Sequence, residues 1–442
     1  MSKRLITILV IAVAFMFGYL AANRQSPAEG QAPRSGAAVP SAVGDMELTG
    51  PYEPVADWPK DLSTLPGNEK WTWGSGEGIF AESPNRVLIL QRGELPVLPR
   101  GGGRGGNNPY TPVNDLLSKI APGASVPVMG LIRNNTGASP PSTLDGPDGK
   151  ALNYNTDGSG KNGVDFLWAN CLVVADANGN IIERWNQYDE MFRRPHSVFI
   201  SPYDPERNVW VVDDYRHAIF KFTNDGSKLL QTIGTPNEHA SDDKHFYRPT
   251  FMAWQPDGSF YVADGYANTR VVKFDKDGKY LTAWGEKGTN EGPNGQLETR
   301  PNYFNNVHGI TVDPQTREVY VNDRGNRRIQ IFDENGTFKR MWSLQPPVNL
   351  HFVYIGQDRQ LTVFNNATQH LAKFDLDGHL ITQWGGLGSF DGALWGPHGI
   401  SVDQEGNLYL ASVSAAKPQK FRPRAGANPN FLVGKPVYSA WN

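Results

Sequence analysis

The feature that most constrains the fold of this chain is a repeated unit of four short apolar segments. The copy with the clearest boundaries has apolar runs at residues 249–254, 260–264, 268–275 and 281–285, and Gly, Asp or Asn separates each run from the next. Runs of this length between turn residues predict antiparallel strands joined by tight turns. Related units begin near Pro195, Val307, Leu350 and Pro397, and a more diverged unit begins at Glu77.

Such a repeat predicts one closed architecture rather than several domains. A unit of about 40 to 55 residues with four strands is a propeller blade, because a lone blade leaves both faces uncovered until its neighbours pack on them. Six units predict an all-β, six-bladed β-propeller, with five or seven blades as the alternatives. The repeat outweighs the length of 442 residues, which would otherwise allow two or three domains.

The first unit is interrupted after its second strand. That strand is expected at residues 87–90, and the third and fourth strands are expected near residues 171–174 and 181–185. The insertion, at about residues 95–163, is rich in Gly, Pro and Asn. We expect it to form either a surface loop or a lid over the axis of the ring.

The N-terminal segment has the features of an export or anchor signal. Lys3 and Arg4 precede the uncharged residues 5–22, a length at the short end of what spans a membrane. We expect residues 1–24 to be a signal-anchor segment, with a cleaved signal peptide as the alternative, and residues 25–54 to be a flexible tether. The propeller, residues 55–442, is then expected outside the cytoplasm, either membrane-anchored or secreted.

Composition limits the classes of partner. The formal net charge of −3 gives no overall basic excess, so we expect no nucleic-acid partner. We expect a small-molecule or peptide substrate and a monomeric protein. Cys171 is the only cysteine, which excludes a disulfide within the chain.

Histidines recur at one position of the repeat. Alignment of the first strands of blades one to six places six residues level with one another: Glu77, His196, Thr250, His308, His351 and His398. The histidines of blades two, four and six are evenly spaced around a six-fold ring, so they can surround one ion on the axis. Three imidazoles with an open fourth position are the ligand set of a catalytic zinc. The alternative is that each histidine only bonds a neighbouring strand.

Three other residues do not fit the recurring framework. Alignment of the second strands places Arg92 of blade one level with Arg324 of blade four, across the axis, and Tyr266 follows the second strand of blade three. The aspartates and arginines that recur in the repeat are instead expected to be structural: Asp264, Asp323, Arg270 and Arg328.

These segments resemble a known repeat and a known enzyme family. The units are similar to NHL repeats, and the whole constellation resembles the peptidyl-α-hydroxyglycine α-amidating lyases. The resemblance covers most of residues 77–403 and is strong at residues 192–196, 245–250 and 262–270. It continues through residues 281–286, and residues 79–92 and 308–324 match without a gap.

The resemblance implies metal ligands and residue roles. The implied zinc ligands are His196, His308 and His398. The implied catalytic base is Tyr266, and the implied substrate-binding residues are Arg92 and Arg324. It also implies a structural calcium ion at the backbone carbonyls of Ile79 and Val198, but Gly399 stands where the family has an aspartate ligand. The sequence therefore leaves calcium binding open.

The function implied by the resemblance is zinc-dependent cleavage of the C–N bond of a peptidyl- or N-acyl-α-hydroxyglycine to an amide and glyoxylate. One alternative is a non-catalytic, exported propeller that binds a protein or a glycan. Another is a propeller hydrolase of the lactonase type, which relies on calcium held by Glu, Asn and Asp around the axis. That acidic set is not evident in this sequence.

Overall fold

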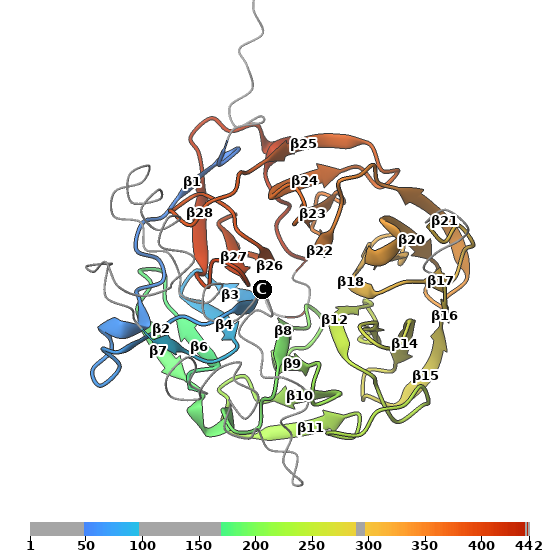
Figure 1. Cartoon of the computed structure of the whole chain (residues 1–442), viewed down its shortest axis with the longest axis horizontal. Coiled ribbons are helices and arrows are strands. Elements are labelled where there is room, and N and C mark those ends of the chain that lie inside the picture. Colours follow the sequence, from blue (N-terminus) through green and yellow to red (C-terminus); the bar gives the residue numbers. More distant parts are fainter. Residues whose placement is uncertain (1–47, 97–168, 289–296, 438–439, 441–442) are drawn as a thin grey trace, which may run out of the picture. The chain divides into compact units, whose positions relative to one another are not determined.

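The computed structural model describes residues 48–96, 169–288, 297–437 and 440. In these residues, six four-stranded antiparallel sheets surround a common axis, which confirms the predicted six-bladed propeller (Figure 1). The predicted anchor, residues 1–24, and nearly all of the predicted insertion lie outside the described residues. No helix of the described part is long and apolar enough to cross a membrane.

The strands of each blade follow one another from the axis outward. Blade one contains β3 (Gly76–Ser83), β4 (Arg86–Gln91), β6 (Leu172–Ala175) and β7 (Ile181–Arg184). Blade two contains β8 (Pro195–Ile200), β9 (Val209–Asp213), β10 (Ala218–Phe222) and β11 (Leu229–Ile233). Blade three contains β12 (Pro249–Trp254), β13 (Phe260–Asp264), β14 (Arg270–Phe274) and β15 (Tyr280–Trp284).

The other half of the ring repeats this order. Blade four contains β18 (Val307–Val312), β19 (Val319–Asp323), β20 (Arg328–Phe332) and β21 (Phe338–Ser343). Blade five contains β22 (Leu350–Ile355), β23 (Leu361–Asn365), β24 (His370–Phe374) and β25 (Leu380–Trp384). Blade six contains β26 (Pro397–Val402), β27 (Leu408–Ser412), β28 (Gln419–Pro423) and β1 (Tyr52–Pro54).

Short elements lie between and beside the blades. The strands are β2 (Trp71–Thr72), β5 (Leu95–Pro96), β16 (Glu286–Lys287) and β17 (Tyr303–Phe304). The 3-10 turns are η1 (Leu62–Thr64), η3 (Asn186–Tyr188), η4 (Arg324–Asn326) and η5 (Pro429–Phe431). Of the predicted insertion, residues 95–163, the structure describes only the two residues of β5, which pair with β2.

The ring is closed by a strand from the opposite end of the sequence. Strand β1 pairs with β28, with Tyr52 opposite Pro423, and so forms the outer strand of blade six. The predicted tether, residues 25–54, is therefore wrong at its C-terminal boundary, because Tyr52–Pro54 belong to the propeller. Strand β1 covers the edge of β28, which would otherwise lie open. The composition of residues 52–54 does not reveal that this edge needs a partner.

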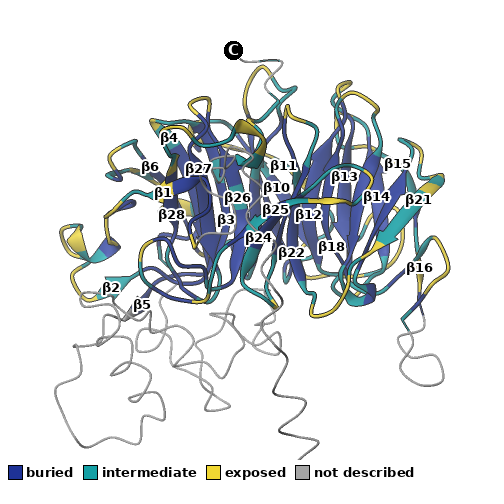
Figure 2. Ribbon diagram, turned by 90° about the horizontal axis from the view of Figure 1, so that it is seen from above, coloured by how far each residue is buried: buried dark blue, intermediate teal, exposed yellow. Residues whose placement is uncertain are grey.

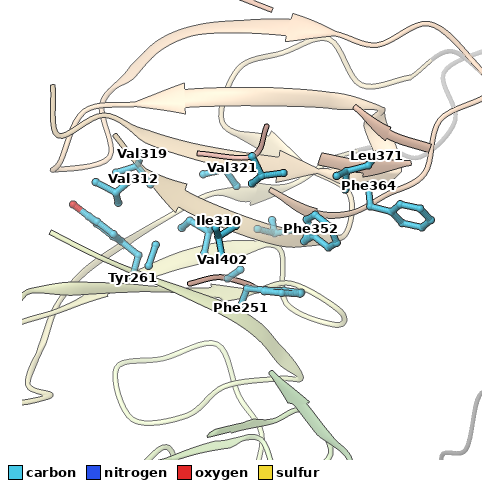
Figure 3. Packing of buried hydrophobic residues seen from close by; sticks show 14 of the residues in the cluster. Phe251, Tyr261, Ile310, Val312, Val319, Val321, Phe352, Phe364, Leu371 and Val402 are labelled. Atoms are coloured by element: carbon cyan, nitrogen blue, oxygen red, sulfur yellow. The ribbon is translucent and has the colours of Figure 1, made fainter. Parts of the chain in front are cut away.

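The core lies between the blades. Strands in the middle of a blade are buried along their whole length, as in β13 and β20, whereas the outer strand β11 has three exposed residues of five. Figure 2 shows this burial through the interior of the ring. Phe251, Ile310, Phe352 and Val402 come from the inner strands of four blades and lie in one hydrophobic cluster (Figure 3). Because each blade buries both faces against neighbours, the inner strands are held firmly around the axis.

Every inner strand has a break in its pairing register near its second residue. The shift falls at His196 in β8 and at His398 in β26, and equivalent shifts occur in β3, β12, β18 and β22. A β-bulge leaves a residue outside the regular ladder and re-aims its side chain. The residues that the sequence alignment places level with one another are therefore those that can turn toward the axis.

The recurring charged residues are structural, as expected. Arg270 Nε donates to Asp264 at 2.9 Å in blade three, and Arg328 Nε donates to Asp323 at 2.7 Å in blade four. Both pairs are buried, and each aspartate also accepts backbone N–H groups from the segment before its blade, as Asp323 does from Asn305. The pairs join the end of the second strand to the start of the blade.

Candidate metal centre

Three histidines of alternate blades meet on the axis. His196, His308 and His398 are 0, 0 and 3% exposed, and one ring nitrogen from each lies within 4.8 Å of the others. Their ring centroids are 4.6 to 5.2 Å apart, and the rings are steeply inclined to one another. We call these three residues the tripod. The structure brings together the complete histidine set that the sequence predicted.

The orientation of each imidazole is set by the next blade. His196 Nδ1 donates to the carbonyl of Thr250 at 2.9 Å, and His398 Nδ1 donates to the carbonyl of Glu77 at 2.8 Å. His308 Nδ1 donates in the same way to the carbonyl of His351. Because a carbonyl only accepts, the proton lies on Nδ1 and the lone pair on Nε2. Such a bond is the usual support of a metal-binding histidine.

The charge state of the tripod suits a metal ion. Burial, with smaller effects from neighbouring histidines and arginines, lowers the pKa of His196 and His398 well below the ordinary value of 6.5. Burial and the nearby Arg324 do the same to the pKa of His308. All three rings are therefore neutral at pH 7, and neutral imidazole is the ligand form. Three neutral imidazoles fit zinc or another borderline divalent metal.

His351 occupies the same register position in blade five but does not complete this group. Its Nδ1 donates to the carbonyl of Pro397 at 2.9 Å, and its ring centroid is 5.5 Å from that of His398 and 6.3 Å from that of His308. Burial and the charge of Arg324 lower the pKa of His351 to about 3. It is a neutral neighbour of the tripod, and its backbone carbonyl orients His308.

An apolar cavity lies behind the tripod along the axis. The ring of Phe251 lies 5.1 to 5.4 Å from all three tripod rings and forms part of the cavity wall. The cavity has a volume of about 160 Å³, and Ile79, Val198 and Gly399 line it. A Cβ added at Gly399 would lie 2.9 Å from the Cα of Gly78, so the packing leaves no space there for an aspartate. Calcium binding at Ile79 and Val198 stays a prediction.

Tyr266 reaches the tripod from the loop after β13. Its phenol oxygen lies 3.1 Å from Nε2 of His196 and 3.0 Å from Nε2 of His308. The preceding Gly265 makes this approach possible, because a Cβ there would lie 1.9 Å from the carbonyl oxygen of Val307 in the next blade. A hydroxyl group bound at the tripod would therefore meet the Tyr266 oxygen.

The two predicted arginines lie near the tripod in different environments. Arg92 is 3% exposed and forms an ion pair with Glu77 at 2.9 Å. Burial raises the pKa of Glu77 to about 7, against the opposing effects of Arg92 and the Ser75 hydroxyl. Arg324 is only partly buried, and its guanidinium carbon lies 5.3 Å from the centre of the Tyr266 ring.

The sequence reasoning missed two arginines that also adjoin Tyr266. The guanidinium carbons of Arg194 and Arg248 lie 5.8 and 4.7 Å from the Tyr266 ring centre. Both residues directly precede the proline that begins the inner strand of a blade, Pro195 in blade two and Pro249 in blade three. This repeated Arg-Pro pair is the sequence signal that could have identified them.

The fold and this site define a class of protein, a six-bladed propeller whose axis could hold a metal ion. Comparisons with known proteins show which members of this class the chain resembles. Residues 304–332 match the NHL repeat. Peptidyl-alpha-hydroxyglycine alpha-amidating lyase 1 of Drosophila melanogaster is 29% identical over 59% of this chain and 50% of its own length. Lyase 2 of the same organism is 39% identical over 55% of this chain and 58% of its own length.

These matches confirm the resemblance expected from the sequence. This chain carries an NHL repeat, is a six-bladed propeller and is similar to amidating lyases. It spans about half the length of those two lyases. NHL repeat-containing protein 3 of Mus musculus is also similar, at 27% identity over 59% of this chain and 75% of its own length.

Proposed function

We propose that this chain is a zinc-dependent lyase that cleaves the C–N bond of an N-acyl- or peptidyl-α-hydroxyglycine to an amide and glyoxylate. The observation that carries the proposal is the phenol oxygen of Tyr266, within 3.1 Å of the Nε2 atoms of two tripod histidines. A metal site with a base beside it provides the two parts needed to deprotonate a hydroxyl group. Similarity to two amidating lyases supports the same reaction.

The tripod nitrogens would hold the metal, and Tyr266 would move the proton. Zinc bound there would act as a Lewis acid that lowers the pKa of the substrate hydroxyl. Tyr266, as a phenolate, takes the hydroxyl proton while the C=O bond of glyoxylate forms and the C–N bond breaks. The electron pair of that bond moves to the nitrogen, and the phenol returns its proton there. The tyrosine thus ends as it began, and no further reactant is needed.

Positive charge around the ring serves this proton transfer. The guanidinium groups of Arg248 and Arg324 lie 4.7 and 5.3 Å from the Tyr266 ring centre. Fixed positive charge beside the reacting atoms stabilises the negative charge that develops during proton transfer. A preorganised set of charges contributes without rearranging during the reaction.

Arg324 is the first candidate to bind the substrate carboxylate. Among the described residues, no carboxylate forms an ion pair with its guanidinium group. Arg92, in contrast, is already paired with Glu77 at 2.9 Å. Planar guanidinium donors can bind both oxygens of a carboxylate. We therefore propose that Arg324 binds the substrate carboxylate. Arg92, which stays paired with Glu77, contributes to binding from that ion pair.

The reaction is tested with zinc-loaded protein and a synthetic N-acyl-α-hydroxyglycine, with glyoxylate as the measured product. Tyr266→Phe should bind zinc as the wild type does and lower kcat by about 10² to 10⁴, because the base is lost and the ring is kept. Tyr280→Phe, on the outer strand β15, is the matched control and should retain activity. Zinc-loaded wild type that releases no glyoxylate above the metal-free background would refute the proposal.

A second candidate function is a binding propeller without catalysis. The observation that favours it is the similar extent of the match to NHL repeat-containing protein 3, a protein named only for its repeat. In that case Tyr266→Phe would leave every measured property of the zinc-loaded protein unchanged. Glyoxylate release that depends on Tyr266 distinguishes the lyase from this alternative.

A further inference from the structure

The surroundings of Tyr266 carry more positive charge than one substrate carboxylate requires. Arg194, Arg248 and Arg324 all lie within 5.8 Å of the centre of its ring. Arg92 also acts electrostatically on Tyr266 but is balanced by Glu77. Once Arg324 is assigned to the reacting carboxylate, the charges of Arg194 and Arg248 exceed what that carboxylate needs.

Arg194 and Arg248 share one buried carboxylate. Arg248 Nε and Nη2 donate to the same oxygen of Asp214, at 3.1 and 2.8 Å, and Arg194 Nε lies 3.4 Å from the other oxygen. The carboxylate of Asp214 is 0% exposed. A single guanidinium would neutralise this carboxylate, so the pair carries one positive charge that Asp214 does not balance.

The two guanidinium groups are held in place and remain accessible. Both guanidinium carbons lie 4.6 Å from the centre of the Tyr215 ring. The side chains of Arg194 and Arg248 are 15 and 25% exposed. No described residue accepts a hydrogen bond from Nη1 or Nη2 of Arg194, or from Nη1 of Arg248. Rigid, accessible donors with excess charge are the properties of a carboxylate-binding subsite.

We propose that Arg194, Asp214 and Arg248 form a second anion subsite, and that the substrate is a diacid whose acyl group carries a second carboxylate. The inference rests on the proposed function for the identity of the first carboxylate. Arg248 and Arg324 both lie beside the Tyr266 ring, so a short acyl chain is enough to reach from one to the other. An N-succinyl group, or an acidic residue before the hydroxyglycine, has the required chemistry.

The test measures binding of unreactive glycine analogues, so it does not depend on turnover. N-succinylglycine is compared by calorimetry with its monoacid counterpart, in which the succinyl carboxylate is a primary amide and the glycine carboxylate is kept. The diacid should bind wild type about tenfold more tightly or better, as expected for charge-assisted hydrogen bonds. In Arg248→Gln, and separately in Arg194→Gln, the ratio of the two affinities should fall toward one.

Two controls distinguish the subsite from a general effect of charge and from binding to the metal. Arg422→Gln removes an exposed arginine, paired at the surface with Glu53, and should retain the full diacid preference. The same comparison is made with metal-free protein, because the second carboxylate could instead bind the metal. A preference that disappears with the metal but survives both arginine substitutions would overturn the proposal.

The outcomes also distinguish this inference from the proposed function. Equal affinity of wild type for the diacid and its amide would overturn the subsite, whether or not glyoxylate is released from any substrate. A diacid preference that depends on Arg194 and Arg248, without turnover of any α-hydroxyglycine, would support the subsite and refute the lyase. Thermal unfolding of each variant checks that a lost preference is not caused by a lost fold.

Discussion

The even and odd blades of this propeller differ at the same structural position. The second residue of the inner strand is a tripod histidine in blades two, four and six, whereas blades one, three and five have Glu77, Thr250 and His351 there. The backbone carbonyls of those three residues accept the Nδ1–H groups of the tripod. Even blades thus supply the three imidazoles that meet on the axis, and odd blades orient them.

The side chains of the odd blades turn to other partners. Glu77 pairs with Arg92, Thr250 Oγ1 donates to the carbonyl of His308 at 2.7 Å, and His351 donates to the carbonyl of Pro397. All six blades therefore build the site, although only three contribute the histidines of the tripod. The difference also shows why a fourth histidine at an equivalent position need not be a ligand.

The largest expected effect follows from removing one nitrogen from an even blade. In His308→Asn, the amide can keep the bond to the His351 carbonyl, but the Nε2 atom that would bind the proposed metal is lost. We expect zinc affinity to fall by more than the roughly 10- to 100-fold that loss of an outer partner costs. Zinc competition with a chelator, together with the metal content of the purified protein, measures this change.

The matched variant in an odd blade is His351→Asn. It keeps the backbone carbonyl that orients His308, so zinc affinity should stay within about tenfold of wild type. Equal losses in the two variants would show that His351 is a ligand. No loss in either variant would show that the tripod does not hold the metal.

An intermediate effect is expected from Thr250→Val in blade three. Valine matches the shape of threonine but removes the hydroxyl that donates to the His308 carbonyl in a fully buried site. The free energy of unfolding should fall by about 1 to 3 kcal/mol, the cost of leaving a buried polar group without its partner. Urea denaturation of wild type and variant at the same zinc concentration measures it. A change near zero would mean that this bond between blades adds no stability.

A further effect, on the pH dependence of stability, is expected at His351. Its pKa in the folded protein is about 3, below the ordinary value of 6.5. Between these values the unfolded chain binds a proton that the folded chain does not, so stability falls as the pH is lowered from 6.5 toward 3. His351→Asn cannot take this proton. Its unfolding free energy should therefore fall less steeply, by up to about 1.4 kcal/mol per pH unit.

Paired denaturation curves across this pH range isolate the contribution of His351, because the other titrating groups are common to both proteins. When the unfolding free energy is plotted against pH, the curve of the variant should be flatter than that of wild type below pH 6.5. Parallel curves would show that the folded protein tolerates protonation of His351, contrary to its buried environment.

The repeating part of this protein can be predicted from its sequence alone. Short apolar runs and their Gly and Asp turns have a local cause, because the turn residues fix where each strand ends. Gly278, for example, has a φ of 84° in the turn between β14 and β15. The blades, their four strands and the level positions of the histidines therefore follow from the period of the pattern. The predicted tether failed at β1, because the partner of this strand lies at the other end of the chain.

The particular atoms that form the site depend on how the blades pack together. The bulges at the second residue, the carbonyl that orients each histidine and the shared Asp214 all depend on contacts between blades. His398 and Glu77 lie 321 residues apart, and their bond exists only because the ring closes. A sequence pattern reflects the interactions between each strand and the segments next to it along the chain. The direction of a side chain on the axis is set by groups that closure brings from distant segments.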